Sequence, residues 1–344
     1  MSEGFRHIDG ARTIVFGADA INRAGDLLAS GYTLLTTPRA ATTAPAVVAR
    51  AAAVVAVPAG QVDAVAAQLR ASVTGTRLVA LGGGRVIDVA KALAAADAPR
   101  QVLAIPTSLS GAEMTGVHRH ARGVDDATPR VRPHVVVNDP ALSASQPVDQ
   151  LAASSANALG HALTALINDR STPIARAVAA DAVARLAAGW TDAQPDRQAI
   201  ALGALLAGWA VDHSGLGPHH ALAQTLVREA ALPHAHVNAA LLPFTALSLR
   251  ARDPDAFGRL DERLARPIET LADDLRRLAA AGRLVDLADH PTLLDRATAA
   301  ASRRPELARV TPAVDEHEVE RIYRSAAAPI AELPDDHPDA QPVD

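Results

Sequence analysis

Histidines gather in the middle of the chain at spacings that suit proton transfer or metal binding. Asn157 and His161 lie four residues apart in a helical pattern, so they share one face of a helix. His220 opens a later helix together with His219, and His234 follows fourteen residues further on. An imidazole can transfer a proton near neutral pH or bind a divalent metal. A lone histidine on a helix is more often structural, so the prediction of one site rests on the grouping of His161, His220 and His234.

Three consecutive glycines, Gly82, Gly83 and Gly84, follow an apolar run and precede a helical pattern that contains Asp88. Such a turn places unpaired backbone N–H groups and the positive end of a helix dipole at one point, where a pyrophosphate can bind. A side chain there would hold the phosphate away from the backbone. The run matches neither the spaced glycines of the dinucleotide fingerprint nor a Walker loop. It predicts a nucleotide site, with a ligand-free strand-to-helix turn as the alternative.

The first half of the chain must position the glycine turn, and its short β-type runs alternate with helical patterns. The expected strands are 13–16, 32–36, 53–57, 77–81, 102–105 and 135–137, and the expected helices are 18–30, 45–51, 61–72 and 86–96. This alternation predicts a parallel sheet covered on both faces, whose ligands bind beyond the carboxyl ends of the strands. Three such ends carry candidate residues: Pro38 and Arg39, the glycine turn, and Thr107 with Ser108. Hydroxyls at a strand end can also cap a following helix.

The second half of the chain must position the histidines, and its pattern is helical. Spacing of 3.6 residues is present in 150–167, 174–188 and 196–213, and no strand signal of comparable quality returns. We therefore predict an α/β domain with a Rossmann-like parallel sheet over 1–145 and an all-α helical domain over 146–331. The Pro- and Asp-rich segment 332–344 is predicted to be a disordered tail.

Composition excludes several classes of function. The formal net charge of -5 and the 2% aromatic content argue against nucleic acid or an anionic membrane as a partner. The absence of cysteine excludes disulfides, thiolate nucleophiles and cysteine metal sites. The first ten residues hold no apolar stretch of signal-peptide length, and no run approaches the ~18 apolar residues of a membrane span. We expect a cytoplasmic protein whose alanine-rich helices pack closely through small side chains.

Six motifs follow one another in a consistent order. They are Gly82-Gly83-Gly84 with Asp88, the segment from Pro106 to Thr115, Asp139-Pro140, the segment around Asn157 and His161, His219-His220, and the segment from Pro233 to Ala239. Together they resemble the iron-containing alcohol dehydrogenase superfamily, and its maleylacetate reductase branch in particular. The resemblance implies a nucleotide-binding α/β domain, a helical domain and an active site in the cleft between them, in agreement with the domains predicted above.

The departures from that family bear on the metal. Metal-dependent members use one aspartate and three histidines as ligands, and Asn157 stands at the aspartate position, as it does in maleylacetate reductases. A neutral amide compensates a cation less well than a carboxylate, so we predict no tightly bound metal; if one is present, His161, His220 and His234 would hold it. Three further departures are Gln224 in place of a histidine, Arg85 in place of a small hydroxyl residue and Thr164 in place of a glutamate.

The resemblance implies hydride transfer from a reduced nicotinamide to a small oxo acid, as from maleylacetate to 3-oxoadipate in aromatic compound catabolism. The glycine turn would hold the pyrophosphate, and Asp88 would fix the loop or approach the ribose. His220 is the first choice for the proton donor and His234 the second, with a protonated imidazole stabilising an enolate or alkoxide. The other implied roles are substrate orientation by Asn157 and His161, lining of the nicotinamide side by Thr107, Ser108 and Thr115, contact with adenosine by Pro38, and contact with cofactor or substrate anions by Arg130.

The cofactor and the class of reaction have alternatives. NADH is expected from the branch, but no acidic residue lies in 36–39 and Arg39 can accept a 2′-phosphate, so NADPH is the alternative. The competing functions are a metal-dependent alcohol or aldehyde reductase of the same superfamily, a cyclising lyase related to dehydroquinate synthase, and a catalytically silent homologue that binds a partner. We expect a homodimer with a small-molecule substrate.

Overall fold

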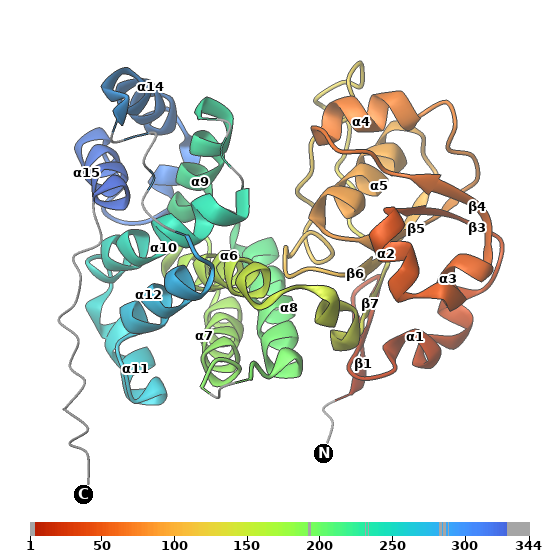
Figure 1. Ribbon diagram of the computed structural model, residues 1–344, viewed down its shortest axis with the longest axis horizontal. Helices are drawn as coiled ribbons and strands as arrows, with labels where there is room; N and C mark the ends of the chain where they lie inside the picture. Colours follow the sequence, from red (N-terminus) through yellow and green to blue (C-terminus); the bar gives the residue numbers. More distant parts are fainter. Residues whose placement is uncertain are drawn as a thin grey trace, which may run out of the picture.

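A computed structural model describes residues 4–191, 194–230, 232, 234–281, 284, 287 and 289–328. The first half forms one seven-stranded sheet with helices on both faces, and the second half forms a bundle of helices beside it (Figure 1). The strands are β1 (Phe5–Asp9), β2 (Arg12–Phe16), β3 (Tyr32–Thr36), β4 (Ala51–Ala56), β5 (Arg77–Gly82), β6 (Gln101–Pro106) and β7 (Val135–Asn138).

Helices flank the sheet before residue 100 and make up the bundle after residue 147. Those of the first half are α1 (Ala20–Arg23), α2 (Pro38–Thr43), α3 (Pro45–Ala49), α4 (Val62–Leu69) and α5 (Gly84–Ala96), with a 3-10 turn η1 (Gly25–Leu28). Those of the second half are α6 (Val148–Ile167), α7 (Pro173–Ala188), α8 (Arg197–Ser214), α9 (Pro218–Glu229), α10 (His234–Arg250), α11 (Pro254–Leu264), α12 (Ile268–Leu278), α14 (Pro291–Ser302) and α15 (Glu316–Ala327). Two further 3-10 turns are η2 (Pro140–Ser145) and η3 (Pro305–Arg309).

The strand order of the sheet is β1-β2-β7-β6-β5-β3-β4, and only the β1–β2 pair is antiparallel. From β3 the chain moves outward to β4, whereas from β5 it moves in the opposite direction to β6. The order therefore reverses between β3 and β5, which is where parallel sheets of this kind bind their ligands. Thr36 pairs with Leu81, and Gly82 pairs with Pro106. The carboxyl ends of β3, β5 and β6 thus lie side by side, as the sequence predicts.

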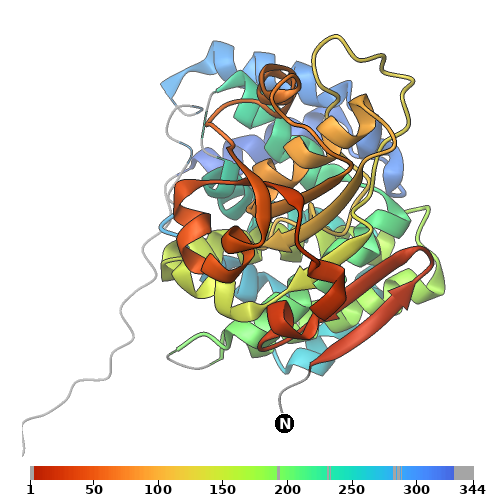
Figure 2. The ribbon, with the colours of Figure 1, turned by 90° about the vertical axis from the view of Figure 1, so that its right-hand side faces the viewer.

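Side chains of the central strands alternate between two cores. Leu78 and Ala80 of β5 face the core formed with α4 and α5, whereas Val79 and Leu81 face the core formed with α1, α2 and α3. Figure 2 views the molecule from the side of the sheet, with the helical bundle behind it. Continuous apolar strands of this kind are typical of a parallel sheet covered on both faces. The predicted fold class, a Rossmann-like α/β sheet domain followed by an all-α part, is confirmed.

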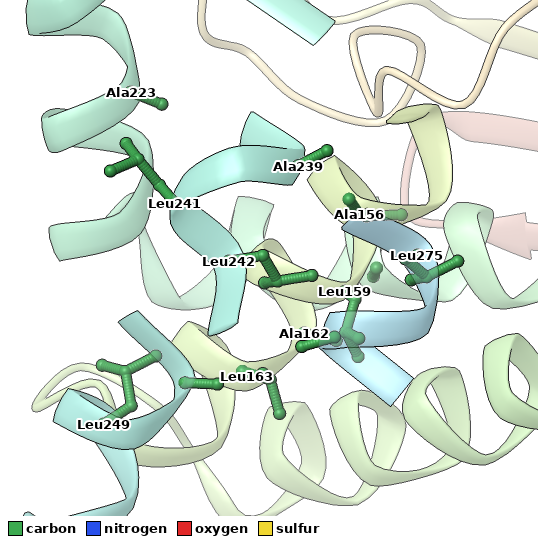
Figure 3. Packing of buried hydrophobic residues seen from close by; sticks show 14 of the residues in the cluster. Ala156, Leu159, Ala162, Leu163, Ala223, Ala239, Leu241, Leu242, Leu249 and Leu275 are labelled. Carbon is green, nitrogen blue, oxygen red and sulfur yellow. The ribbon is translucent and has the colours of Figure 1, made fainter. Parts of the chain in front are cut away.

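The bundle is built around α6, which is buried along almost its whole length. Ala156, Leu159 and Ala162 of this helix pack against Leu242 of α10 and Leu275 of α12 (Figure 3). Small residues let helices approach closely. A Cβ atom added to Gly203 of α8, for example, would lie 3.0 Å from the carbonyl oxygen of Ala182 in α7.

The loop after β6 carries candidate site residues, and a buried lysine holds it against the sheet. Lys91 of α5 is fully buried, and its Nζ donates to the carbonyl oxygens of Ala112 at 2.9 Å, Thr115 at 3.1 Å and Val117 at 2.7 Å. The same ammonium pairs with Asp88 at 2.8 Å. A buried charge of this kind is stable only when its donors are satisfied, so the geometry of the loop depends on Lys91.

The helical half holds the same loop from the opposite side. A Cβ atom added to Gly208 of α8 would lie 3.2 Å from the Cα of Gly111. The backbone N–H of Gly116 donates to Asp212 of α8 at 3.1 Å, and Arg12 of β2 donates to the carbonyl of Met114 at 2.6 Å. The loop is therefore clamped between sheet and bundle.

Local structure departs from the sequence predictions in three places. The predicted helix 18–30 is two short pieces, α1 and η1, because Gly25 adopts a positive φ of 48° between them. The predicted helix 45–51 ends at Ala49, and Ala51 already belongs to β4. Strand β1 was not predicted, since its residues show no apolar alternation and are mostly exposed. The predicted tail 332–344 lies outside the described residues.

Within the described ranges, no single helix is long and apolar enough to cross a membrane, and the one pair that reaches this length and composition jointly, α8 with α9, is bent by 98°.

Candidate active site

The glycine turn has the form of an anion cradle. Gly83 is the N-cap of α5 and supplies no side chain to cap the first helical N–H groups. A Cβ atom on Gly83 would lie 3.0 Å from Ser108 Oγ, and one on Gly84 would lie 2.9 Å from Ser110. Side chains at these two positions would therefore collide with the serines of the loop after β6, so the close approach of loop and turn requires glycine. The turn fits a dinucleotide pyrophosphate.

A cavity of about 170 Å³ adjoins the strand ends on the side of β3. Its lining residues are Thr37, Arg39, Ala40, Thr107, Ser108, Gln146 and Gln150. The structure therefore brings three predicted cofactor residues, Arg39, Thr107 and Ser108, to one cavity. Gln146 and Gln150, which precede and begin α6, complete its wall and have no sequence signal that points to a ligand. Pro38 is the first residue of α2, and the Thr37 hydroxyl caps that helix at 3.2 Å from Ala40 N.

Asp88 and Thr115 act in the structure through Lys91. Asp88 binds the lysine ammonium, and the Thr115 carbonyl accepts from it. Of the two roles predicted for Asp88, this geometry corresponds to fixing the loop. The sequence analysis assigns no role to Lys91. A lysine inside the otherwise apolar run of α5, three residues after an aspartate, is the signal that could have found it.

Arg130 lies at a second cavity, of about 380 Å³, which shares no lining residue with the first. Its Nε donates to the carbonyl of His118 at 3.1 Å. The second cavity is lined by Asp63, His118, Arg119, His120, Ala121, Arg122, Gly123, Val124, Asp126 and Arg130. The structure thus does not bring Arg130 to the cavity beside β3. Contact of Arg130 with cofactor or substrate anions stays a prediction.

Two of the three predicted histidines form a pair. The ring centroids of His161 on α6 and His220 on α9 are 5.5 Å apart. Both ring nitrogens of His220 are buried and have no hydrogen-bond partner. His219 differs from His220 in having a partner on α10, because its Nδ1 lies 2.8 Å from Thr245 Oγ1, although its Nε2 is buried without one. Asn157 is also buried, one helical turn before His161.

The surroundings of the pair lower the pKa of both histidines. Burial, with a smaller contribution from the positive charge of His234, lowers the pKa of His161 to about 4. Burial, followed by the charge of His161, holds the pKa of His220 well below 6.5. Both shifts favour the neutral imidazole in the ligand-free protein, and a protonated imidazole that stabilises the reacting substrate stays a prediction.

His234 begins α10 and remains exposed, although the surrounding protein lowers its pKa below 6.5. Its charge acts on both His161 and His220, so it lies in their neighbourhood. The amide of Asn238 donates to the His234 carbonyl at 2.8 Å and anchors the first turn of the helix.

The donor set does not fit a metal ion. Among the residues that the structure describes, no group of three or more histidine, cysteine, aspartate or glutamate side chains is arranged to hold one. His161, His220 and His234 therefore do not form a ligand cluster, and the fourth position is the neutral amide Asn157. We derive no step through a metal.

The remaining departures from the family pattern have structural counterparts. Thr164 is buried and packs so closely against Gly217 that a Cβ atom there would clash with its methyl group. Because Gly217 precedes α9, this contact fixes the position of the first turn of that helix, which contains His219 and His220.

Arg85 is exposed at the start of α5. Gln224 contacts Arg304, an arginine that sequence reasoning missed because the two lie 80 residues apart.

Gly160→Ala is expected to destabilise the protein by roughly 1–3 kcal/mol and to disturb the histidine pair. A Cβ atom at this position would lie 2.6 Å from His219 Nε2, and the buried ring cannot move without losing its contact with Thr245. Urea unfolding measures the change. Gly258→Ala on α11 is the matched control, because no atom lies within 4 Å of its added Cβ and alanine favours a helix. Equal stability of the two variants would contradict this account.

Glu113→Gln is expected to change how stability depends on pH. Glu113 is almost fully buried, and burial raises its pKa to about 7. The folded protein therefore binds a proton that the unfolded chain, with a pKa near 4.5, releases. This carboxyl lowers the free energy of unfolding as the pH rises from about 4.5 to 7, and the glutamine variant should lack that contribution. Urea midpoints across this range, compared with the exposed-site control Glu262→Gln, measure it; parallel profiles for Glu113→Gln and the wild type would contradict it.

Comparison with known proteins shows which family the fold and the sequence of the helical half resemble. The sequence model described as "Fe-containing alcohol dehydrogenase family, C-terminal" matches residues 151–321, which include Asn157, His161, His220 and His234. The backbone superimposes on an iron-containing alcohol dehydrogenase of Corynebacterium glutamicum with a TM-score of 0.78, covering 91% of this chain and 94% of the other at 23% identity. The matched region is just under half of the chain, and it is similar to the iron-containing alcohol dehydrogenase family, as the ordered motifs predict.

Maleylacetate reductases are among its similar relatives within that family. One from Rhodococcus opacus is 35% identical over 203 residues, which are 56% of this chain and 56% of the relative. The alignment thus spans little more than half the length of that curated relative. The structure of a maleylacetate reductase from Rhizobium sp. matches with a TM-score of 0.78 at 26% identity, covering 95% of this chain and 98% of the other.

Proposed function

We propose that this protein is an NAD(P)H-dependent oxidoreductase that reduces a small oxo acid, with maleylacetate as the candidate substrate. The observation that carries the proposal is the buried pair of His161 and His220, in which His220 has no hydrogen-bond partner. A buried polar group without a partner is costly unless a ligand satisfies it. The nucleotide edge of the sheet and the maleylacetate reductases among the relatives support the same reaction.

Backbone and side-chain groups at the carboxyl edge of the sheet bind and orient the cofactor. The N–H groups at the start of α5 bind its pyrophosphate, and the hydroxyls of Thr107 and Ser108 orient its remainder. A bound reduced nicotinamide supplies a hydride. We propose NADH as the donor and keep NADPH as the alternative, since Arg39 lines the cavity and no carboxylate does.

The histidine pair handles the oxygen and the proton of the substrate. His220, neutral in the ligand-free protein, donates a ring N–H to the substrate oxygen, while His161 and Asn157 fix its position. The negative charge of an arriving oxo acid raises the pKa of His220, because it favours the imidazolium form. Hydride addition to the conjugated carbon–carbon double bond leaves an enolate, which takes one proton from His220. Solvent then restores that proton, so one hydride and one proton are consumed in each turnover.

The proposed assembly is a cytoplasmic homodimer that binds neither nucleic acid nor membrane, in line with the acidic net charge. Size-exclusion chromatography with light scattering tests the dimer.

The reaction is tested by following oxidation of NADH and of NADPH with maleylacetate and with neutral aldehydes and ketones, each with and without a chelator. Turnover of maleylacetate that survives chelation supports the proposal. Turnover of neutral aldehydes that is lost on chelation and restored by Fe²⁺ or Zn²⁺ would replace it with a metal-dependent alcohol or aldehyde reductase. Dinucleotide binding without turnover of any of these substrates would reject maleylacetate as the substrate.

A further inference from the structure

One face of α9 continues beyond His220 toward the protein surface. Gln224 and Arg228 follow at four-residue spacing, so all three side chains belong to the same side of the helix. Arg304, in the turn between α14 and η3, reaches this face and donates to Gln224 Oε1 at 3.4 Å. The positive charge of Arg304 acts on both His220 and Arg228. The arginine therefore contacts the residue one helical turn after His220 and acts electrostatically on that histidine.

Arg304 is held in place by contacts on one side only. Glu306 accepts from its Nε at 3.0 Å and from its Nη2 at 2.7 Å, and Gln224 is the second partner. Its Nη1 is buried and has no hydrogen-bond partner. The guanidinium is thus oriented by Glu306 and Gln224 while one nitrogen remains without an acceptor.

The buried groups that lack a hydrogen-bond partner, Arg304 Nη1 and the ring nitrogens of His220, define what a ligand must offer. Arg304 Nη1 can only donate, so it requires an acceptor, and a charged acceptor gives the stronger hydrogen bond. A neutral aldehyde or alcohol that fills the site at His220 brings no such group and leaves Arg304 Nη1 unsatisfied. A carboxylate brings acceptor oxygens and the opposite charge, and its planar geometry matches a guanidinium.

We propose that Arg304 is the binding residue for a substrate carboxylate, with Gln224 and Glu306 positioning its guanidinium, while the oxygen at the reacting end of the same substrate binds at His220. This inference rests on the proposed function and narrows it to substrates that carry a carboxylate away from the reacting carbon. It also explains Gln224, where the family usually has a histidine. The amide oxygen of glutamine accepts from Arg304, whereas a protonated histidine at this place would repel it.

The test compares Arg304→Gln with the wild type in the full-length protein. Adipate, a six-carbon dicarboxylate that cannot be reduced, serves as the probe, and its Kd is measured by calorimetry with NADH present. The variant should bind adipate at least roughly tenfold more weakly, because one charge-assisted contact is lost, and should keep the wild-type Kd for NADH. If maleylacetate is turned over, its KM should rise by a similar factor, with a smaller change in kcat.

Three further variants separate recognition from folding. Arg296→Gln on α14 is the matched control, because that exposed arginine pairs with Glu229 instead, and it should leave the Kd for adipate unchanged. Arg304→Lys should retain part of the affinity, since the charge is kept and the planar fork is lost. Gln224→Met should weaken adipate binding without removing any charge, because Arg304 loses a positioning contact. Circular dichroism and NADH binding verify that each variant is folded.

The outcomes distinguish this inference from the proposed function. Wild-type affinity for adipate in a folded Arg304→Gln variant, or no binding of adipate to the wild type, overturns the carboxylate site whatever the enzyme reduces. Loss of adipate binding in that variant, in a protein that does not reduce maleylacetate, supports the carboxylate site and rejects only the proposed substrate.

Discussion

His220→Ala is expected to lower kcat for the reduction by roughly 10²-fold or more while leaving the Kd for the dinucleotide unchanged. His220 is the candidate that the structure leaves with two buried ring nitrogens and no partner, and it lies beside His161. The sheet edge that we propose as the cofactor site belongs to the other half of the chain, so the affinity for the dinucleotide should not depend on this side chain. Steady-state kinetics and fluorescence titration with NADH measure the two quantities separately.

A second substitution at the same position reports on what His220 does. His220→Asn keeps an N–H that can donate to a substrate oxygen but cannot deliver a proton at neutral pH. If proton delivery is the role, this variant should lose as much activity as His220→Ala. His317→Ala, at an exposed position in α15, controls for the loss of an imidazole as such. An unchanged kcat in His220→Ala would remove His220 from the mechanism and turn attention to His234.

Gly83→Val is expected to abolish measurable dinucleotide binding while the helical half remains folded. The backbone of Gly83 has a φ of -78°, which valine can adopt, so the effect does not come from backbone strain. It comes from space, because the Cβ atom alone would lie 3.0 Å from Ser108 Oγ and the branched side chain would cover the N–H groups at the start of α5. Without access to those groups, a pyrophosphate loses its principal donors.

The measurement for this glycine variant is a calorimetric titration with NADH and with NADPH, alongside far-ultraviolet circular dichroism. Ala52→Val, at an exposed position in β4 of the same sheet, is the control, since it adds the same side chain where space is open. Retained affinity in a folded Gly83→Val protein would show that the phosphates bind elsewhere.

Local patterns were sufficient for the parallel strands of the sheet and for the edge at which their carboxyl ends meet. The strands β3, β5 and β6 follow from apolar runs bounded by turn residues, and their parallel arrangement follows from the intervening helices. Once they are parallel, Thr36, Gly82 and Pro106 must end on the same side, which is why Arg39, Thr107 and Ser108 share a cavity. Such predictions succeed because neighbouring elements constrain one another over short stretches of chain.

Contacts between distant segments could not be predicted in this way. The Gln224–Arg304 contact joins residues 80 positions apart, and the loop clamp joins β2, α5 and α8. The prediction of one helix over 18–30 was also wrong, because helical periodicity does not show that Gly25 adopts a positive φ. In each case the partner or the backbone angle is set by packing, which a pattern along the chain does not contain.

The sequence by itself determined the family resemblance, the fold class and the residue types at the site, since these depend on periodicity, on glycine and on the order of motifs. Only the tertiary structure decided the state of those residues. It gives His161 and His220 surroundings that favour their neutral forms, and it brings Arg304 into contact with Gln224, one helical turn after His220. The physical reason is that ionisation and ligand affinity depend on solvent exclusion and on neighbouring charges, and both arise only when distant segments pack together.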